Sequence, residues 1–309
     1  MRSDLDHLPA NKQRELAHVV RVIFEEFEAA HARGTHKWRK QGRIFKLVLY
    51  GSYARGGWVD DPIGGYKSDY DILVVVNDER LVDFEYWSAA DDRLMRDMTI
   101  AGTLSAPVNL IVHTLTDVNA QLEKGRPFFT DIVRDGVALY EAEGFPFAQP
   151  RNLPPEDAKV EAQKHFDEWF ASARGFSRNA GYAVRDGDLK LAAFLFHQAA
   201  ERFYHCTLLV LTLYSPKSHR LNFLRSHAEE LAPPLIAVWP RDDRFARRCY
   251  ELLRQAYVNA RYSPHYVVTE EELRWTGEQI EELGRIVHEI CTERLAMLEA
   301  EAVTRPDPV

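Results

Sequence analysis

The hydrophobic pattern of this chain changes at a proline-rich segment, and that change constrains the fold more than any other feature. Residues 142–155 hold four prolines and little periodicity, which is typical of a connection between folded parts. Short strand-like runs alternate with helical segments before it, whereas the pattern after it is helical almost throughout. We therefore expect two domains, at residues 1–145 and 156–300, joined by a linker at 146–155.

The first half has the pattern of a small α/β domain. Apolar residues recur every three or four positions over residues 12–32, as an amphipathic helix requires. Four apolar runs, several of them rich in β-branched residues, predict strands at 44–50, 70–76, 108–113 and, more briefly, 137–140. Helical segments are expected between them, at 85–98 and 116–123. Strands that alternate with helices in this way indicate a sheet with helical connections.

The second half is expected to be an all-α helical bundle. Its apolar residues trace one face of a long helix over residues 191–213. Further helices are predicted at 221–231, 244–260 and 270–300. Pro264 should end the helix at 244–260, because the residue before a proline avoids the α region. The whole chain is therefore an α+β domain followed by an α domain.

Composition excludes several classes of protein without naming a function. The net charge of −8 argues against a generally basic nucleic-acid binder, although residues 151–261 carry 17 Lys and Arg against 13 Asp and Glu. That segment predicts either a solvated face with ion pairs or a basic cleft. Cys206, Cys249 and Cys291 are odd in number and far apart, so we expect no disulfide framework. This cysteine usage points to a reducing, cytoplasmic setting, and no apolar stretch is long enough for a membrane span.

Two short motifs in the first half carry the candidate chemistry. Gly51 and Ser52 follow a predicted strand, where a glycine lets backbone approach a ligand and unpaired helix amides suit phosphate oxygens. Asp69 and Asp71 flank Tyr70 at the start of the next strand, so both carboxylates point to one side. Adjacent carboxylates repel each other unless a cation lies between them. Oxygen ligands with phosphate completing the shell predict a Mg²⁺ site.

These motifs resemble the minimal nucleotidyltransferase branch of the DNA polymerase beta-like superfamily. The resemblance rests on residues 49–56 and 68–72, which carry the Gly-Ser and Asp-x-Asp signatures. It implies a small mixed sheet in which Gly51 and Ser52 hold a nucleoside triphosphate, ATP above all. It also implies that Asp69 and Asp71 ligate Mg²⁺ or Mn²⁺ and act in catalysis.

Two basic residues lie close to these motifs in the sequence. Lys67 either meets phosphate or is a solvated loop lysine, and Arg55 either meets phosphate or forms a surface ion pair. Both are therefore candidate nucleotide-binding residues.

One position departs from the family pattern. The superfamily places a third carboxylate on a later strand, and Asn109 stands where that acid is expected. An amide can ligate a metal through its oxygen but cannot act as a general base. Either His113, Asp117 or Asp131 replaces the missing acid, or transfer is slow or absent and the site only binds nucleotide.

The second half resembles HEPN domains, which are helical bundles often found beside minimal nucleotidyltransferases. The resemblance covers about residues 155–300 and rests on residues 196–202 and 256–266. It implies a homodimer formed through the bundle. Its candidate site is made of residues near one helix end: Arg261, Tyr262, His265 and Tyr266.

The function of that second site is left open by its spacing. Many HEPN ribonucleases have Arg-x(4–6)-His, whereas only three residues separate Arg261 from His265. The pair either binds helix-end carbonyls and carboxylates, or binds RNA or nucleotide without cleavage, or cleaves RNA. His197 and His205, two turns apart, are expected in the core or an interface rather than as a metal pair.

These observations support one leading hypothesis and three alternatives. The leading one is a Mg²⁺-dependent transferase that moves AMP from ATP to a hydroxyl of RNA, a small molecule or a protein, with Tyr262 and Tyr266 as candidate acceptors. The second is a nucleotide-binding regulator whose HEPN half dimerises or binds RNA. The third is a HEPN ribonuclease of toxin–antitoxin type, and the fourth, by fold analogy, is antibiotic modification.

Overall fold

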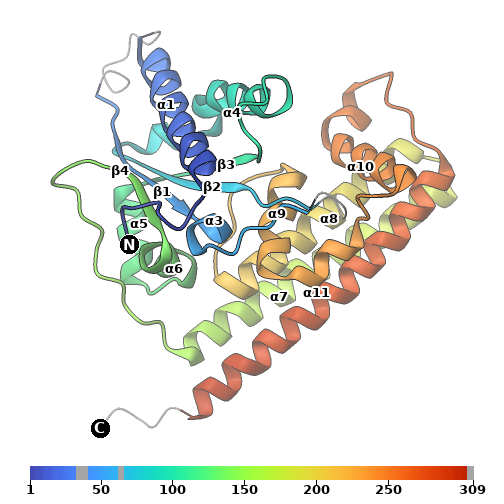
Figure 1. Cartoon of the computed structure of the whole chain (residues 1–309). Coiled ribbons are helices and arrows are strands. Elements are labelled where there is room, and N and C mark those ends of the chain that lie inside the picture. The colour runs from blue at the N-terminus through green and yellow to red at the C-terminus, as the bar shows by residue number, and fades with distance from the viewer. Residues whose placement is uncertain (33–40, 62–65, 305–309) are drawn as a thin grey trace. The chain divides into compact units, whose positions relative to one another are not determined.

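The computed structural model describes residues 1–32, 41–61 and 66–304, which form two compact units (Figure 1). The first unit comprises Met1–Asp60 and Lys67–Asn152, and the second comprises Asp61–Tyr66 and Leu153–Val309. The division between Asn152 and Leu153 falls where the proline-rich segment meets the helical half. Each unit has its own hydrophobic core.

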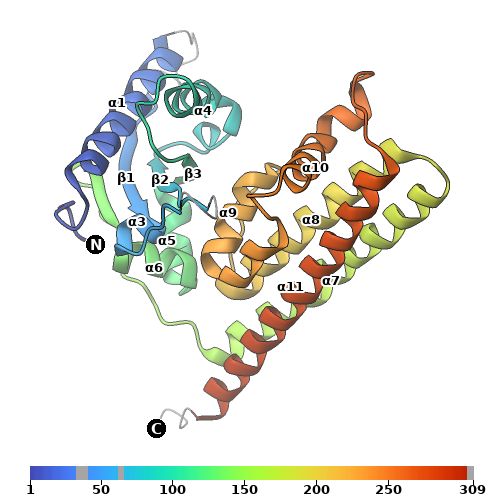
Figure 2. The ribbon, with the colours of Figure 1, turned by 45° about the vertical axis from the view of Figure 1, so that its right-hand side comes forward.

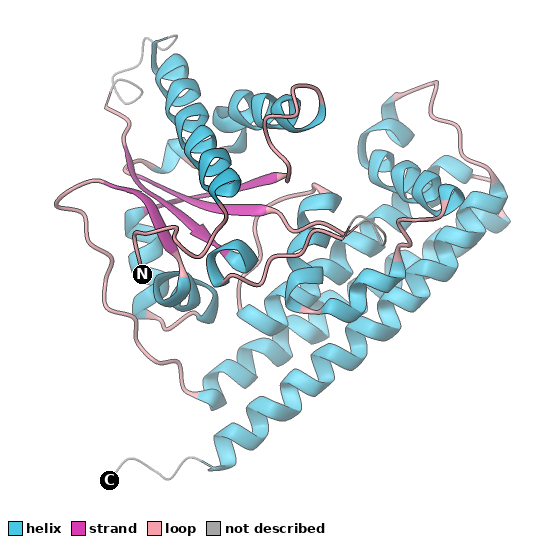
Figure 3. Ribbon diagram, viewed as in Figure 1, coloured by secondary structure: helices cyan, strands magenta, loops and turns pink. Residues whose placement is uncertain are grey.

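The first unit is built on a four-stranded mixed sheet (Figure 3). Its strands are β1 (Ile44–Tyr50), β2 (Tyr70–Val76), β3 (Val108–Thr114) and β4 (Val137–Glu141), in the order β3-β2-β1-β4. β1 is antiparallel to β2 and β4, whereas β2 and β3 are parallel. The expected strands and the mixed sheet are therefore confirmed.

Helices cover both faces of this sheet (Figure 1). One face packs against α1 (Ala10–Ala32) and α4 (Phe84–Thr99), and the short helix η1 (Glu79–Leu81) precedes α4. Alternate strand residues such as Leu47, Ile72 and Val74 point into this core, because successive side chains of a strand face opposite sides. The residues between them, Asp71 among them, therefore face the other side.

That other side is covered by α5 (Leu115–Glu123) and α6 (Pro127–Asp135), with the single-turn α3 (Gly51–Arg55) after β1. The sequence pattern did not predict α6. This helix has nine residues and begins at Pro127, a residue that is favoured at the first position of a helix but is more often read as a turn or loop signal in a sequence. Its buried residues are Phe129 and Ile132, which close this face.

The proline-rich segment is bound to the first unit over much of its length. Phe145 stacks on Phe45 with ring centroids 3.7 Å apart, and Phe147 lies 4.8 Å from the buried ammonium of Lys46. The backbone amides of Ala148 and Arg151 donate to α5, at 2.8 and 2.9 Å. Most of the expected linker at 146–155 is thus anchored on the sheet unit, and the next helix begins at Pro155.

The second unit is all helical, as expected (Figure 2). Its helices are α7 (Pro155–Arg185), α8 (Leu189–Thr212), α9 (Leu221–Leu231), η2 (Pro233–Val238), α10 (Arg244–Tyr262) and α11 (Glu270–Thr304). Close packing of α11 on α8 depends on Gly284, where an added Cβ would lie 2.8 Å from the Phe203 ring. None of the helices in the described ranges is both long and apolar enough to cross a membrane.

Candidate functional site

The turn between β1 and α3 forms one side of the candidate site. Gly51 has φ of 75°, in the left-handed region that favours glycine. Ser52 is buried at the first turn of α3, and the amides of Gly56 and Gly57 donate to its carbonyl. The strand therefore ends abruptly, which leaves the first amides of α3 at the edge of the sheet.

The sheet register brings the acidic motif to the same edge. Asp71 pairs with Tyr50 of β1 on one side and with Asn109 of β3 on the other. Asp69, Asp71 and Asn109 are only 9%, 2% and 6% exposed. Three polar side chains from two neighbouring strands are thus gathered next to the Gly51 turn, as the sequence predicted for the first two.

Asn109 bridges the two carboxylates. Its Nδ2 donates to Asp69 Oδ2 at 2.8 Å and to Asp71 Oδ1 at 3.1 Å. A primary amide carries two N–H donors, so one side chain can satisfy one oxygen of each acid. Asn109 stands where the third carboxylate was expected, and in this structure its amide offsets the repulsion between the other two.

The donor set fits a divalent cation with few protein ligands. Within the described residues, no three His, Cys, Asp or Glu side chains are arranged to hold a metal ion. Mg²⁺, however, is commonly held by one or two carboxylates together with substrate phosphates and water. Asp69 and Asp71 would supply the carboxylates, and Asn109 would turn its Oδ1 toward the cation instead of its amide protons.

The three expected replacements for the missing acid have other partners. His113 lies four residues after Asn109 on β3, about 13 Å along the strand, and its Nδ1 is 2.6 Å from Asp117 Oδ2. Asp131 of α6 pairs with Arg134 at 2.8 Å. His113 and Asp117 are thus engaged with each other, at a distance from the acid pair.

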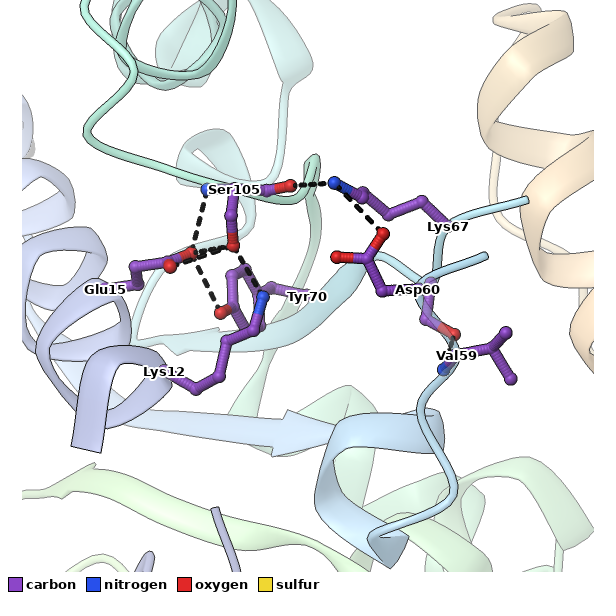
Figure 4. Close-up of polar contacts among 8 residues, drawn as sticks. Lys12, Glu15, Val59, Asp60, Lys67, Tyr70 and Ser105 are labelled. Carbon is purple, nitrogen blue, oxygen red and sulfur yellow. Dashed lines mark hydrogen bonds and ion pairs between the residues drawn. The ribbon is translucent and has the colours of Figure 1, made fainter. Parts of the chain in front are cut away.

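Lys67 and Arg55, the two predicted phosphate ligands, also have partners within the protein. Lys67 donates to the carbonyl of Ser105 at 2.8 Å and lies 3.3 Å from Asp60 Oδ1 (Figure 4). A hydrogen bond from Arg134 lowers the pKa of Asp135, and the charge of Arg55 lowers it further, so Arg55 faces α6. Lys67 is therefore held toward Ser105 and Asp60 in this structure.

The second predicted site is only partly assembled. Arg261 donates to the carbonyl of Tyr257 at 2.7 Å and lies over the Tyr257 ring, whereas His265 is exposed beyond the end of α10. Tyr262 is 74% exposed, but Tyr266 is 4% exposed and its hydroxyl donates to Leu252 at 2.9 Å. Burial also raises the pKa of Tyr266. In this conformation Tyr266 is therefore too buried to be an acceptor, the role predicted for it, whereas the hydroxyl of Tyr262 is accessible.

Sequence reasoning missed a buried carboxylate in the helical unit. Glu201 of α8 lies 3.1 Å from Nδ1 of His219 and 3.5 Å from Nε2 of the buried His197. Burial favours the neutral acid, but the neighbouring imidazoles of His197 and His219 hold the pKa of Glu201 below its usual value. His219 is largely exposed and stacks on Tyr257, with centroids 5.1 Å apart.

Of the contacts made by Glu201, only the one with His197 could be predicted from the sequence. His197 and Glu201 are four residues apart on one helix, which indicates a shared face. His219 belongs to the loop before α9, so its approach to Glu201 depends on tertiary structure. His197 and His205 are both buried, as expected.

Two comparisons with known proteins define the class of this chain. The family model described as the HEPN domain matches residues 166–294, so the second half of the chain contains a HEPN domain. That match confirms the resemblance of the second half.

The chain is also 30% identical over 104 residues to a "Putative protein adenylyltransferase" of Methanocaldococcus jannaschii. The match spans 34% of this chain and 86% of the archaeal protein. The chain belongs to the same family as that relative.

Proposed function

We propose that this protein is a nucleotidyltransferase that moves AMP from ATP to a hydroxyl acceptor with the help of Mg²⁺. The observation that carries the proposal is the meeting of Asp69, Asp71 and Asn109 beside the Gly51 turn. Two buried carboxylates that share one amide donor form a site that a cation can enter. The name of the archaeal relative supports adenylyl transfer as the reaction.

In the proposed reaction, the acceptor oxygen attacks the α-phosphorus of ATP, and the bond to pyrophosphate breaks. The backbone at Gly51 and Ser52 would lie along the triphosphate, because the glycine has no side chain to obstruct it. Asp69 and Asp71 would hold Mg²⁺, which neutralises charge on the phosphates. Asn109 cannot take the acceptor proton, so that proton would pass to solvent and transfer would be slow.

A protein hydroxyl is the acceptor that the relative's name suggests, and Tyr262 is the candidate within this chain. It is exposed at the C-terminal end of α10, unlike Tyr266. A tyrosine acceptor would gain an AMP group through its phenolic oxygen and lose its proton.

Incubation with α-labelled ATP and Mg²⁺ tests the proposal. We expect label on protein with the wild-type chain, and none with Asp69→Asn. Asp92→Asn, an exposed acid on α4, should behave like wild type, and Tyr262→Phe should reduce self-labelling. Equal labelling by wild type and Asp69→Asn would contradict the proposal, whereas tight ATP binding without any transfer would favour a regulatory nucleotide-binding protein.

A second candidate function belongs to the helical unit, where the contact between Glu201 and His219 favours RNA binding or cleavage. A buried carboxylate that accepts from one imidazole nitrogen orients the other nitrogen for proton transfer. Arg261 and His219 both contact Tyr257, so a cation lies close by for phosphate. RNA cleavage lost in His219→Gln and kept in His265→Gln would support this function, and intact RNA after long incubation would exclude cleavage.

A further inference from the structure

A partly buried polar cluster lies between α1 and the start of β2 (Figure 4), on the face of the sheet opposite Asp71. Glu15 of α1 accepts hydrogen bonds from the Tyr70 hydroxyl at 3.0 Å and from the Ser105 amide at 2.9 Å. The Ser105 hydroxyl lies 2.8 Å from both oxygens of Glu15. One carboxylate therefore contacts the segments that begin β2 and β3.

Both of those segments carry residues of the candidate site. Tyr70 lies between Asp69 and Asp71, so a shift of its ring would move the strand that holds both acids. Ser105 stands four residues before Asn109, and the Tyr70 amide donates to Pro107 between them at 2.8 Å. Glu15 thus joins the two segments next to the backbone hydrogen bond at which the pairing of β2 with β3 begins.

The surroundings hold this cluster in one arrangement. Lys12, one turn before Glu15, is 3% exposed and donates to the Ser105 hydroxyl at 2.5 Å. Its ammonium also lies 5.4 Å from the Tyr53 ring and 5.2 Å from the Trp58 ring, within range of a cation–π interaction. The Tyr70 hydroxyl is the donor in its hydrogen bond to Glu15.

We propose that Glu15 is a positioning residue for the cation site: by joining Tyr70 to Ser105 it fixes Asp69 and Asp71 against Asn109. The role rests on the proposed function, since it concerns the same acids. Glu15→Gln keeps the size of the side chain but replaces one acceptor oxygen by an NH₂ donor. The amide oxygen can accept from only two of the three present donors, and the NH₂ group cannot accept from the Ser105 hydroxyl, so the hydrogen bonds that join β2 and β3 through this side chain must rearrange.

The experiment compares the full-length chain with its Glu15→Gln and Glu26→Gln variants. Glu26 also lies on α1 and pairs with Arg93 at 2.9 Å, so it is a control for loss of a helix carboxylate. Affinity for Mn²⁺ with ATP is measured by calorimetry, and thermal midpoints show that both variants fold. Loss of a partner that orients a metal ligand typically weakens metal binding about 10- to 100-fold, and we expect that loss for Glu15→Gln alone.

A second readout separates this inference from the proposed function. The side-chain amide resonance of Asn109, observed without metal in asparagine-labelled protein, should move in Glu15→Gln and stay in place in Glu26→Gln. Unchanged Mn²⁺ affinity and an unchanged resonance in Glu15→Gln would overturn the positioning role. If wild type binds no Mn²⁺ with ATP, the proposed function fails, and the Asn109 resonance alone decides whether Glu15 positions these side chains.

Discussion

The two units each contain buried carboxylates, but the carboxylates have different partners. In the sheet unit, Asp69 and Asp71 accept from the amide of Asn109, a neutral group that does not titrate. In the helical unit, Glu201 lies between His197 and His219, two groups that can carry a proton.

This difference separates two kinds of chemistry. Two anions held together by one neutral amide retain a net negative charge, and a divalent cation can compensate it. The carboxylate of Glu201 instead has imidazoles beside it, and its contact with His219 Nδ1 orients that exposed ring. The sheet unit is therefore suited to bind a cation and phosphate, and the helical unit to move or hold a proton.

The largest effect is expected from Asp71→Asn. This change removes one of the two anions that would hold the cation, and loss of one such electrostatic contact typically costs about 10²- to 10³-fold in rate. We expect adenylyl transfer to fall by that factor while the thermal midpoint stays near that of wild type. Adenylyl transfer that persists in Asp71→Asn would show that the acid pair of the sheet unit does not bind the cation needed for transfer.

Acid should destabilise the helical unit through buried histidines outside the Glu201 contact. Burial lowers the pKa of His205 and of His227 to about 4, against about 6.5 for a free histidine. Below pH 6.5 the unfolded chain therefore binds protons that the folded chain does not, and stability falls until about pH 4.

The expected loss is about 3 kcal/mol for each of these histidines between pH 6.5 and pH 4. His227→Gln should lose correspondingly less of its unfolding free energy than wild type over this range, measured by urea unfolding at several pH values. The exposed His265→Gln serves as the control. If the unfolding free energies of wild type, His227→Gln and His265→Gln fell equally with pH, His227 would not be held neutral by burial.

Asn109→Asp gives the sheet unit a third anion and so tests whether Asp69, Asp71 and residue 109 share one cation. The change removes a hydrogen-bond donor to two charged groups and adds repulsion, so we expect a loss of about 1–3 kcal/mol without divalent cations. Mg²⁺ should restore much of that stability and raise the rate of transfer. A thermal midpoint that does not respond to Mg²⁺ would indicate that the three side chains do not share a cation.

The smallest effect is expected from Lys67→Met. Lys67 is partly exposed and already bound to Ser105 and Asp60, and such ion pairs contribute at most about 1 kcal/mol. ATP affinity, measured by calorimetry, should change by less than roughly fivefold. A much larger loss would mean that Lys67 leaves Asp60 and binds phosphate.

Local sequence patterns were sufficient to predict the strands and the acid pair. Residues 44–50 and 70–76 are short apolar runs, and Asp69 and Asp71 adjoin the second run. The place of Asn109 came from the family resemblance, and the structure shows Asn109 paired with Asp71 across the parallel strands β2 and β3. Contacts between distant segments were not predictable in this way, as the approach of Glu15 to Ser105 and of His219 to Glu201 shows.

The central claim is that Asp69 and Asp71 bind one divalent cation together with ATP. A crystal structure with Mn²⁺ and a non-hydrolysable ATP analogue tests it most directly, because anomalous scattering locates Mn²⁺. We predict Mn²⁺ between the two carboxylates, the triphosphate along Gly51 and Ser52, and the amide protons of Asn109 turned away from the acids. Nucleotide bound elsewhere, or Asn109 still donating to both acids with no Mn²⁺ beside them, would contradict the account.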